Sequence, residues 1–398
     1  MFAKSKSAPA PGAARPRLVN GPLMLVFLAD FGALTGFYLL LPVVPQYATA
    51  AGMGDIGAGM TTAVLMLSTV ATEFVTPRLA ARFGYRAVLA VGLVLLGLPA
   101  LALPISASMP LLMAVCFLRG TGLAIIFVVC GALSAELIPV ERRGEGLGVF
   151  GVVAGLPAVI AMPVGVWLAG QVGYTPVFVS GALVALAGLA ALPGLPGRTL
   201  PAEEQPLRMV AGLRTPALLR PSIVFAATAT GAGVIATFLP SAMSRTSEHL
   251  VAAALLVNAL AATVSRWWAG RYSDRRGAAG LLVPGALVTG LGMLMLVLVS
   301  NPVAVLAAMV LVGCGFGVVQ NVSMALMLDR VPPSGYGTVS AIWSVAYDVG
   351  YGVGAAGAGF LAASTGYPVA FGLNGLVIIA VLGLAMGTIR VRVARLSS

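Results

Sequence analysis

Runs of about 20 apolar residues recur along the whole sequence, and each is long enough to cross a hydrocarbon core of ~30 Å as a helix. Hydrophobic residues make up 59% of the chain, and its mean hydropathy is +1.02. A soluble domain is about half apolar and interrupts its apolar runs with polar residues. The sequence therefore predicts an all-α polytopic membrane protein.

Twelve transmembrane helices are predicted, at residues 22–45, 57–77, 87–105, 111–135, 146–169, 175–194, 221–243, 248–269, 279–299, 302–328, 337–363 and 367–388. Of the 23 lysines and arginines, 21 fall in segments on one side of these spans, including both ends of the chain. Because basic residues concentrate in cytoplasmic segments, both termini are predicted to be cytoplasmic. The net charge of +11 is therefore explained by basic residues in cytoplasmic segments, and no nucleic-acid partner is expected.

The second half of the chain repeats features of the first at a constant spacing. Gly84 and Gly277 lie 193 residues apart, and the same offset relates ten residue pairs without a gap. These further pairs include Arg78 and Arg271, Arg82 and Arg275, Gly120 and Gly313, Gly122 and Gly315, Gly173 and Gly366, and Tyr174 and Tyr367. Such an offset indicates a duplicated structure.

The duplication divides the chain into two bundles. We predict a disordered cytoplasmic tail at 1–18, a six-helix bundle at 19–194, a cytoplasmic linker at 195–220, a second six-helix bundle at 221–388 and a cytoplasmic tail at 389–398. The first apolar run is too long for a signal-peptide core and is read as a retained span. Parallel halves of this kind place a substrate site near the midplane between them. One chain holds both halves, so a monomer suffices for function.

The charged segment Gly270-Arg271-Tyr272-Ser273-Asp274-Arg275-Arg276-Gly277 stands out in a chain that is only 9% charged. It resembles the cytoplasmic loop signature of the major facilitator superfamily, Gly-x-x-x-Asp-Arg-x-Gly, at Gly270, Asp274, Arg275 and Gly277. The first-half copy keeps Arg78, Arg82, Gly84 and Arg86 but has Pro77 and Ala81 in place of the glycine and the acid. The resemblance implies that these loops gate the transport path and that the second-half loop carries more of this role.

Other residues resemble the branch of twelve-span drug:proton antiporters. Gly36, Pro42 and Pro45 match the first-span signature Gly-x5-Pro-Val-x-Pro, and Arg119-Gly120-Thr121-Gly122 is close to the fourth-span arginine motif without its glutamine. In the fifth span, Met162-Pro163-Val164-Gly165-Val166 keeps the proline but not the glycine spacing of the branch.

Three charged residues lie deep in predicted spans and are the candidates for proton coupling: Asp30, Arg119 and Asp348. A carboxylate in hydrocarbon is costly and marks a pathway or a relay by default, whereas the alternative for Asp30 is a hydrogen-bonded packing role. Arg119 keeps its charge and therefore needs water, an acid or an anion beside it. The resemblance implies a role in proton coupling, with Asp30 as the natural charge partner. The alternative is a structural ion pair that braces spans one and four. Asp348 is either a second protonation site or the partner of a helix dipole. The glycines around it, among them Gly350 and Gly354, are read as helix-packing residues.

The resemblance implies a substrate cavity lined by spans one, four, seven and ten. Gln320 and Asn321 in span ten point about 100° apart, so we expect one of the two to face the cavity. Phe37, Tyr38 and Trp343 add aromatic surface, although packing is the more common role of aromatic residues in spans. A cavity so poor in charge suits an amphipathic, largely apolar small molecule better than a sugar.

Enzyme chemistry has no support in the sequence. There is no nucleophile–base constellation, phosphate loop or set of paired metal ligands, so no catalytic residue, cofactor or metal is predicted. The interpretation is proton-gradient-driven efflux of small amphipathic or drug-like molecules. A metabolite or sugar-type symporter or uniporter and a non-transporting membrane receptor are the alternatives. High alanine, glycine and arginine usage with few lysines indicates a bacterial protein of the cytoplasmic membrane.

Overall fold

The computed structural model describes residues 20–138, 143–195, 215–243, 248–331 and 335–396, and within these ranges every regular element is a helix. The predicted tail at 1–18 and residues 196–214 of the predicted linker lie outside the described residues. The second half begins earlier than predicted, because its first helix starts at Pro216 and not at residue 221. The last helix continues to Leu396, through most of the predicted tail at 389–398.

Each predicted span is occupied by one helix or by two or three consecutive helices. The first half comprises α1 (Gly21–Leu40), α2 (Val43–Ala48), η1 (Thr49–Met53), α3 (Gly54–Glu73), α4 (Thr76–Phe83), α5 (Tyr85–Gly97), η2 (Leu98–Ala102), α6 (Met109–Leu137), α7 (Arg143–Val172), α8 (Tyr174–Ala187) and η4 (Gly188–Gly194). The second half comprises α10 (Pro216–Ala242), α11 (Glu248–Arg276), η5 (Ala279–Leu281), α12 (Leu282–Met295), η6 (Leu296–Leu298), α13 (Pro302–Leu328), α14 (Tyr336–Thr365) and α15 (Tyr367–Leu396).

Nine helical stretches of the described chain are long and apolar enough to cross a membrane. The first of them, Gly21–Glu73, contains both α1 and α3, because α2 and η1 join them without a long break. The glycine-rich α14 is not among the nine, and the apolar part of α15 forms a shorter stretch, Tyr367–Leu382. Helices are the expected solution in hydrocarbon, since each satisfies its backbone hydrogen bonds internally.

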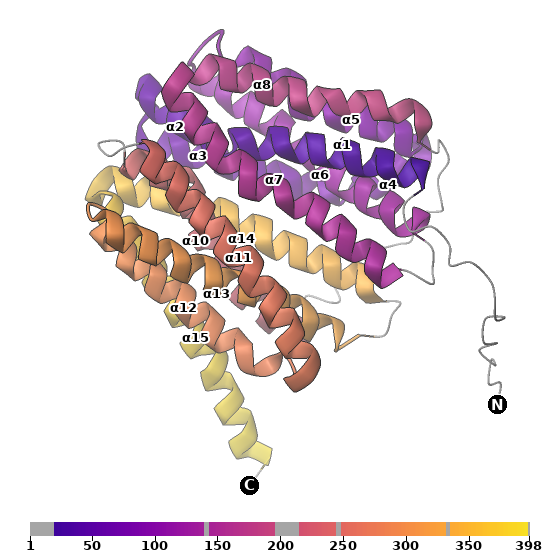
Figure 1. Cartoon of the computed structure of the whole chain (residues 1–398). Coiled ribbons are helices and arrows are strands. Elements are labelled where there is room, and N and C mark those ends of the chain that lie inside the picture. The colour runs from indigo at the N-terminus through magenta and orange to yellow at the C-terminus, as the bar shows by residue number, and fades with distance from the viewer. Residues whose placement is uncertain (1–19, 139–142, 196–214, 244–247, 332–334, 397–398) are drawn as a thin grey trace, which may run out of the picture.

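The helices form two bundles that lie side by side (Figure 1), one built from α1 to α8 and the other from α10 to α15. The main contacts between the bundles are made by α3 with α14 and by α7 with α11. These four helices therefore form the boundary along which the two halves meet.

Backbone geometry repeats at the offset of the predicted duplication. Gly84 and Gly277 both have positive φ, 87° and 83°, and each ends a helix just after the charged loop segment. Gly173 and Gly366 form a second pair, with φ of 82° and 83°, at the turns before α8 and α15. Glycine adopts this region without the steric cost that a side chain brings.

Interhelical contacts repeat at the same offset. A Cβ on Gly120 would overlap the carbonyl oxygen of Leu65, and a Cβ on Gly313 would overlap that of Asn258, which lies 193 residues after Leu65. The equivalent glycines Gly122 and Gly315 each face the carbonyl of another glycine, Gly92 and Gly285, again 193 residues apart. The two halves therefore pack their helices through the same close approaches.

Glycines of α14 allow close contact with α10, as predicted from their spacing. A Cβ on Gly350 would overlap the carbonyl oxygen of Ala226, and one on Gly354 would lie 2.6 Å from the Cα of Thr230. On the other face of α14, a Cβ on Gly359 would lie 2.7 Å from the carbonyl oxygen of Asp55 in α3. In a membrane, helix association relies on such packing because lipid provides no hydrophobic driving force.

We predict that Gly354→Ala destabilises the protein by about 1–3 kcal/mol, because the added methyl group forces α10 and α14 apart. The change would appear as a lower melting temperature of the protein in detergent. Gly357→Ala, one helical turn away, is the matched control, since a Cβ there meets nothing within 4 Å. Equal melting temperatures for the two variants would contradict this account of the α10–α14 contact.

Candidate functional site

Asp30 lies in the middle of α1 and is completely buried. Cys130 of α6 faces its carboxyl group, but neither carboxylate oxygen has a hydrogen-bond partner among the described residues. A packing role would require such partners, because a buried polar group without one costs free energy.

Arg119 in α6 is 1% exposed. Its Nε donates to the carbonyl oxygen of Leu96 in α5 at 3.4 Å, and its Nη1 has no partner among the described residues. Asp30 accepts no hydrogen bond there, so the ion pair expected from the sequence is not formed in this conformation. Arg119 thus keeps an unused donor in the interior of the first half.

Asp348 lies in α14 at the boundary between the halves and is 7% exposed. Its carboxylate interacts electrostatically with Tyr38 of α1 and with Tyr351 of its own helix. Glu73, at the end of α3, also lies within electrostatic reach of Asp348. Two carboxylates from opposite halves therefore face one region, an arrangement that the sequence did not indicate for Glu73.

A pocket of about 310 Å³ lies in the second half, lined by Arg266, Gln320, Asn321, Met324, Ala325, Leu328 and Trp343. It brings together residues of α11, α13 and α14. Both amides line it, although only one of Gln320 and Asn321 was expected to face the cavity. Arg266 was not among the candidates chosen from the sequence. The available signal was an arginine at the end of an apolar run, four residues before Gly270.

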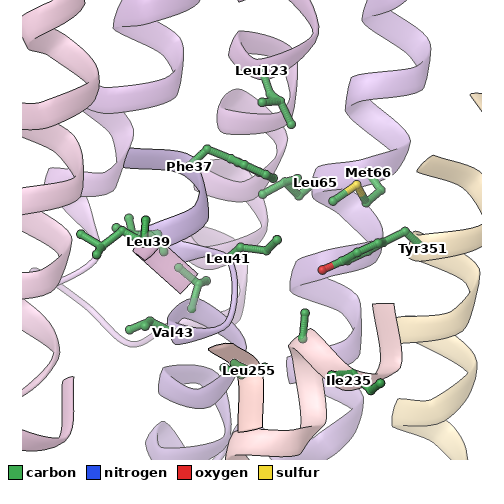
Figure 2. Packing of buried hydrophobic residues seen from close by; sticks show 14 of the residues in the cluster. Phe37, Leu39, Leu41, Val43, Leu65, Met66, Leu123, Ile235, Leu255 and Tyr351 are labelled. Carbon is green, nitrogen blue, oxygen red and sulfur yellow. The ribbon is translucent and has the colours of Figure 1, made fainter. Parts of the chain in front are cut away.

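The aromatic candidates divide between the core and the pocket. Phe37 is 3% exposed and extends toward Leu65 (Figure 2), so in this conformation it packs inside the first half. Its neighbour Tyr38 contacts the Phe37 ring edge-on, with centroids 5.0 Å apart, and turns toward the charged groups of the second half. Trp343 lines the pocket itself.

The predicted gating loops differ between the halves. Arg86 donates hydrogen bonds to the carbonyl oxygens of Pro193, at 2.9 Å, and of Leu195. These two bonds join the start of α5 to the end of η4. Arg82 lies over the ring of Phe83, with 5.2 Å between the guanidinium carbon and the ring centroid.

In the second half, Gly270 lies against the amide of Asn321, with 3.5 Å between a Cβ placed on Gly270 and Nδ2. The side chain of Asp274 lies outside the described residues. No contact that distinguishes a gating role is found for Arg78 or Arg275 in the described structure.

The first-span signature residues shape the backbone of α1. Gly36 lies against the carbonyl oxygen of Gly181 in α8, where a side chain would overlap it. Pro42 lies at the break between α1 and α2, and Pro45 lies in the first turn of α2. Gly165 of α7 in turn lies against the carbonyl oxygen of Leu39. These residues pack the end of α1 tightly between α7 and α8.

Hydrogen bonds between the halves close one end of the structure. The hydroxyl of Tyr367 in α15 donates to Asp55 at the start of α3 at 2.6 Å. The hydroxyls of Thr62 in α3 and Thr237 in α10 are 3.0 Å apart and buried. The pocket around Arg266 lies toward the other ends of α11 and α13.

A family model and the similar sequences agree on one family. The sequence model of the Major Facilitator Superfamily matches residues 26–355 and, in a second alignment, residues 221–397. An uncharacterized MFS-type transporter of Mycobacterium tuberculosis is 26% identical over 360 residues, which cover 83% of this chain and 84% of that protein. A chloramphenicol resistance protein of Streptomyces lividans is 28% identical over 300 residues, or 72% of this chain and 75% of that protein.

The crystal structure of the nucleoside transporter NupG is similar in fold, with a TM-score of 0.79. The alignment covers 92% of this chain and 99% of that chain at 11% identity, so the likeness concerns the fold alone.

We predict that Tyr367→Phe opens the closed end more often, because it removes a hydrogen bond between the halves. A net contribution of about 0.5–1.5 kcal/mol corresponds to about a two- to tenfold shift in population. In a cysteine-free background carrying Ala58→Cys, at a buried position of α3 near Asp55, labelling by a membrane-impermeant maleimide should accelerate by that factor. Tyr336→Phe, an exposed tyrosine at the other end of α14, is the control. Unchanged labelling in Tyr367→Phe would show that this bond does not hold the end closed.

Proposed function

Because the chain belongs to the Major Facilitator Superfamily, we propose that it exports small amphipathic or drug-like molecules in exchange for protons. The family is one of membrane transporters and not of enzymes, and the chain is a multi-pass membrane protein with a small-molecule substrate. The proposal concerns the direction of transport, the coupling ion and the class of substrate.

We place the protein in the cytoplasmic membrane of a bacterium as a monomer with twelve spans and both termini in the cytoplasm. The distribution of basic residues supports this orientation. In it, the end closed by Asp55 and Tyr367 faces outward, and the pocket around Arg266 lies toward the cytoplasm. Transport then requires that the two halves rock about their boundary, so that the closing hydrogen bonds break when the cytoplasmic end shuts.

The observation that carries proton coupling is the isolation of Asp30. A completely buried carboxyl group is costly in hydrocarbon, and such a group marks a proton or ion pathway by default. If rocking of the halves brings water or the unused Arg119 donor to it, the ionised form is stabilised and the proton is released. Asp348 is the proposed second protonation site, because it lies at the moving boundary and faces Glu73 of the other half.

The class of substrate is supported by the pocket and by one relative. Apolar and amide side chains dominate the lining around Arg266 and Trp343, which suits an aromatic or aliphatic molecule with few polar groups. The similarity to a chloramphenicol resistance protein favours export of a drug-like molecule over uptake of a nutrient.

We predict that Asp30→Asn abolishes gradient-driven transport, because the amide cannot exchange a proton. Inverted vesicles with an acidic interior and radiolabelled chloramphenicol provide the measurement. Wild-type vesicles should accumulate the drug, and the variant should fall to the level of vesicles without the protein. Asp329→Asn is the matched control, since Asp329 is exposed at the end of α13.

Unchanged accumulation in a well-inserted Asp30→Asn variant would overturn the role of Asp30. Equilibration without accumulation would indicate a uniporter, and uptake by intact cells a symporter. Binding without flux would indicate a receptor.

A further inference from the structure

Arg266 is the one charged residue among those that line the pocket in the second half. The other lining residues are two amides, three aliphatic residues and a tryptophan. Arginine remains protonated in proteins, so its charge must be balanced by a neighbouring group, by water or by a ligand. The pocket therefore carries a permanent positive charge beside an apolar surface.

Among the residues that the structure describes, no carboxylate pairs with this charge. The Nε of Arg266 has no hydrogen-bond partner among the described residues. The groups with which the guanidinium interacts electrostatically are the phenols of Tyr38 and Tyr347. Tyr38 belongs to the first half and Tyr347 to the second, so Arg266 faces the path between the two halves. A planar donor with unused hydrogen-bonding capacity suits a carboxylate, which it can bind through two parallel bonds.

Trp343 is held as a fixed wall of the same pocket. Its Nε1 donates to the hydroxyl of Ser323 at 3.1 Å. Its ring stacks on Phe225, with centroids 4.5 Å apart and an angle of 18° between the planes. Because both the polar edge and one face of the indole are engaged, its remaining surface is presented in one orientation. Such a fixed ring offers a stacking surface to an aromatic ligand.

The amides complete the polar part of the pocket. The Oε1 of Gln320 is buried without a hydrogen-bond partner among the described residues. The amide of Asn321 is seated against Gly270, where a larger residue would meet it. The volume of about 310 Å³ is at the lower end of the ~300–1,000 Å³ range of small-molecule sites, which limits the ligand to a small ring system.

We propose that this pocket binds aromatic carboxylates, with the carboxylate on Arg266 and the ring against Trp343. The proposal rests on the proposed transport function and narrows its substrate class: small aromatic anions bind best, neutral aromatic molecules such as chloramphenicol bind through the ring alone, and lipophilic cations are disfavoured. A cation of the same size would meet the charge of Arg266 without a carboxylate in the lining to balance it.

The test compares two probes that share a ring system and differ in charge, 1-naphthoate and 1-naphthylmethylammonium. Isothermal titration measures their binding to the full-length protein in nanodiscs of neutral lipid, without a pH gradient. We expect 1-naphthoate to bind and the cation to bind at least tenfold more weakly. Arg266→Gln should weaken 1-naphthoate binding about tenfold or more. Arg266→Lys should weaken it less, because lysine keeps the charge but cannot form the two parallel hydrogen bonds of the guanidinium group.

Arg330→Gln is the charge control, because Arg330 is exposed just beyond α13 and outside the lining. Trp343→Leu should weaken binding of 1-naphthoate several-fold, and Trp268→Leu, on the exposed face of α11, should not. Melting temperatures of all variants identify any that fail to fold, and in that case Arg266→Lys provides the comparison.

Preferential binding of the cation, binding of neither probe, or equal effects of Arg266→Gln and Arg330→Gln would overturn the inference. These outcomes are independent of the proposed function, which is tested by gradient-driven accumulation of chloramphenicol. Binding of 1-naphthoate to a protein that moves nothing along a proton gradient would retain the pocket assignment and reject proton-coupled export.

Discussion

The cost of placing a polar group in hydrocarbon is the constraint on which this structure depends. It forces the backbone into helices, which satisfy their own hydrogen bonds, and it makes each buried charge conspicuous. Asp30, Arg119 and Arg266 all retain an atom without a hydrogen-bond partner among the described residues. In a static helical bundle these groups would be a pure loss of stability. In a protein whose halves move, such groups gain hydrogen-bond partners in another conformation or when a ligand binds.

Close packing at glycines gives the two halves their shared architecture and their boundary. The same glycine contacts recur at an offset of 193 residues within each half. Between the halves, α14 approaches α3 through Gly359, and on its other side it packs on α10 through Gly350 and Gly354. A helix with small residues on two faces can serve as an axis about which its neighbours shift. Asp348 lies on that helix, so its surroundings change with any shift in the relative position of the halves.

The sequence allowed a large part of this description to be predicted. Apolar runs located the helices, because crossing a bilayer requires a minimum length of apolar chain. The repeat located the halves, and the rarity of charge within apolar runs selected Asp30, Arg119 and Asp348. The sequence was less informative about which buried charges pair with each other. Asp30 and Arg119 were matched because they are opposite in charge, yet they are not hydrogen-bonded in this conformation.

What the sequence alone determined is the class of fold, its duplication and the identity of the buried charges, because these follow from hydropathy and from spacing along the chain. Only the tertiary structure decided which residues share a site. Arg266, Gln320 and Trp343 come from three helices, and Glu73 lies within electrostatic reach of Asp348 across the boundary between the halves. Helix rotation and crossing are set by side-chain packing between elements distant in sequence, and no local pattern encodes them.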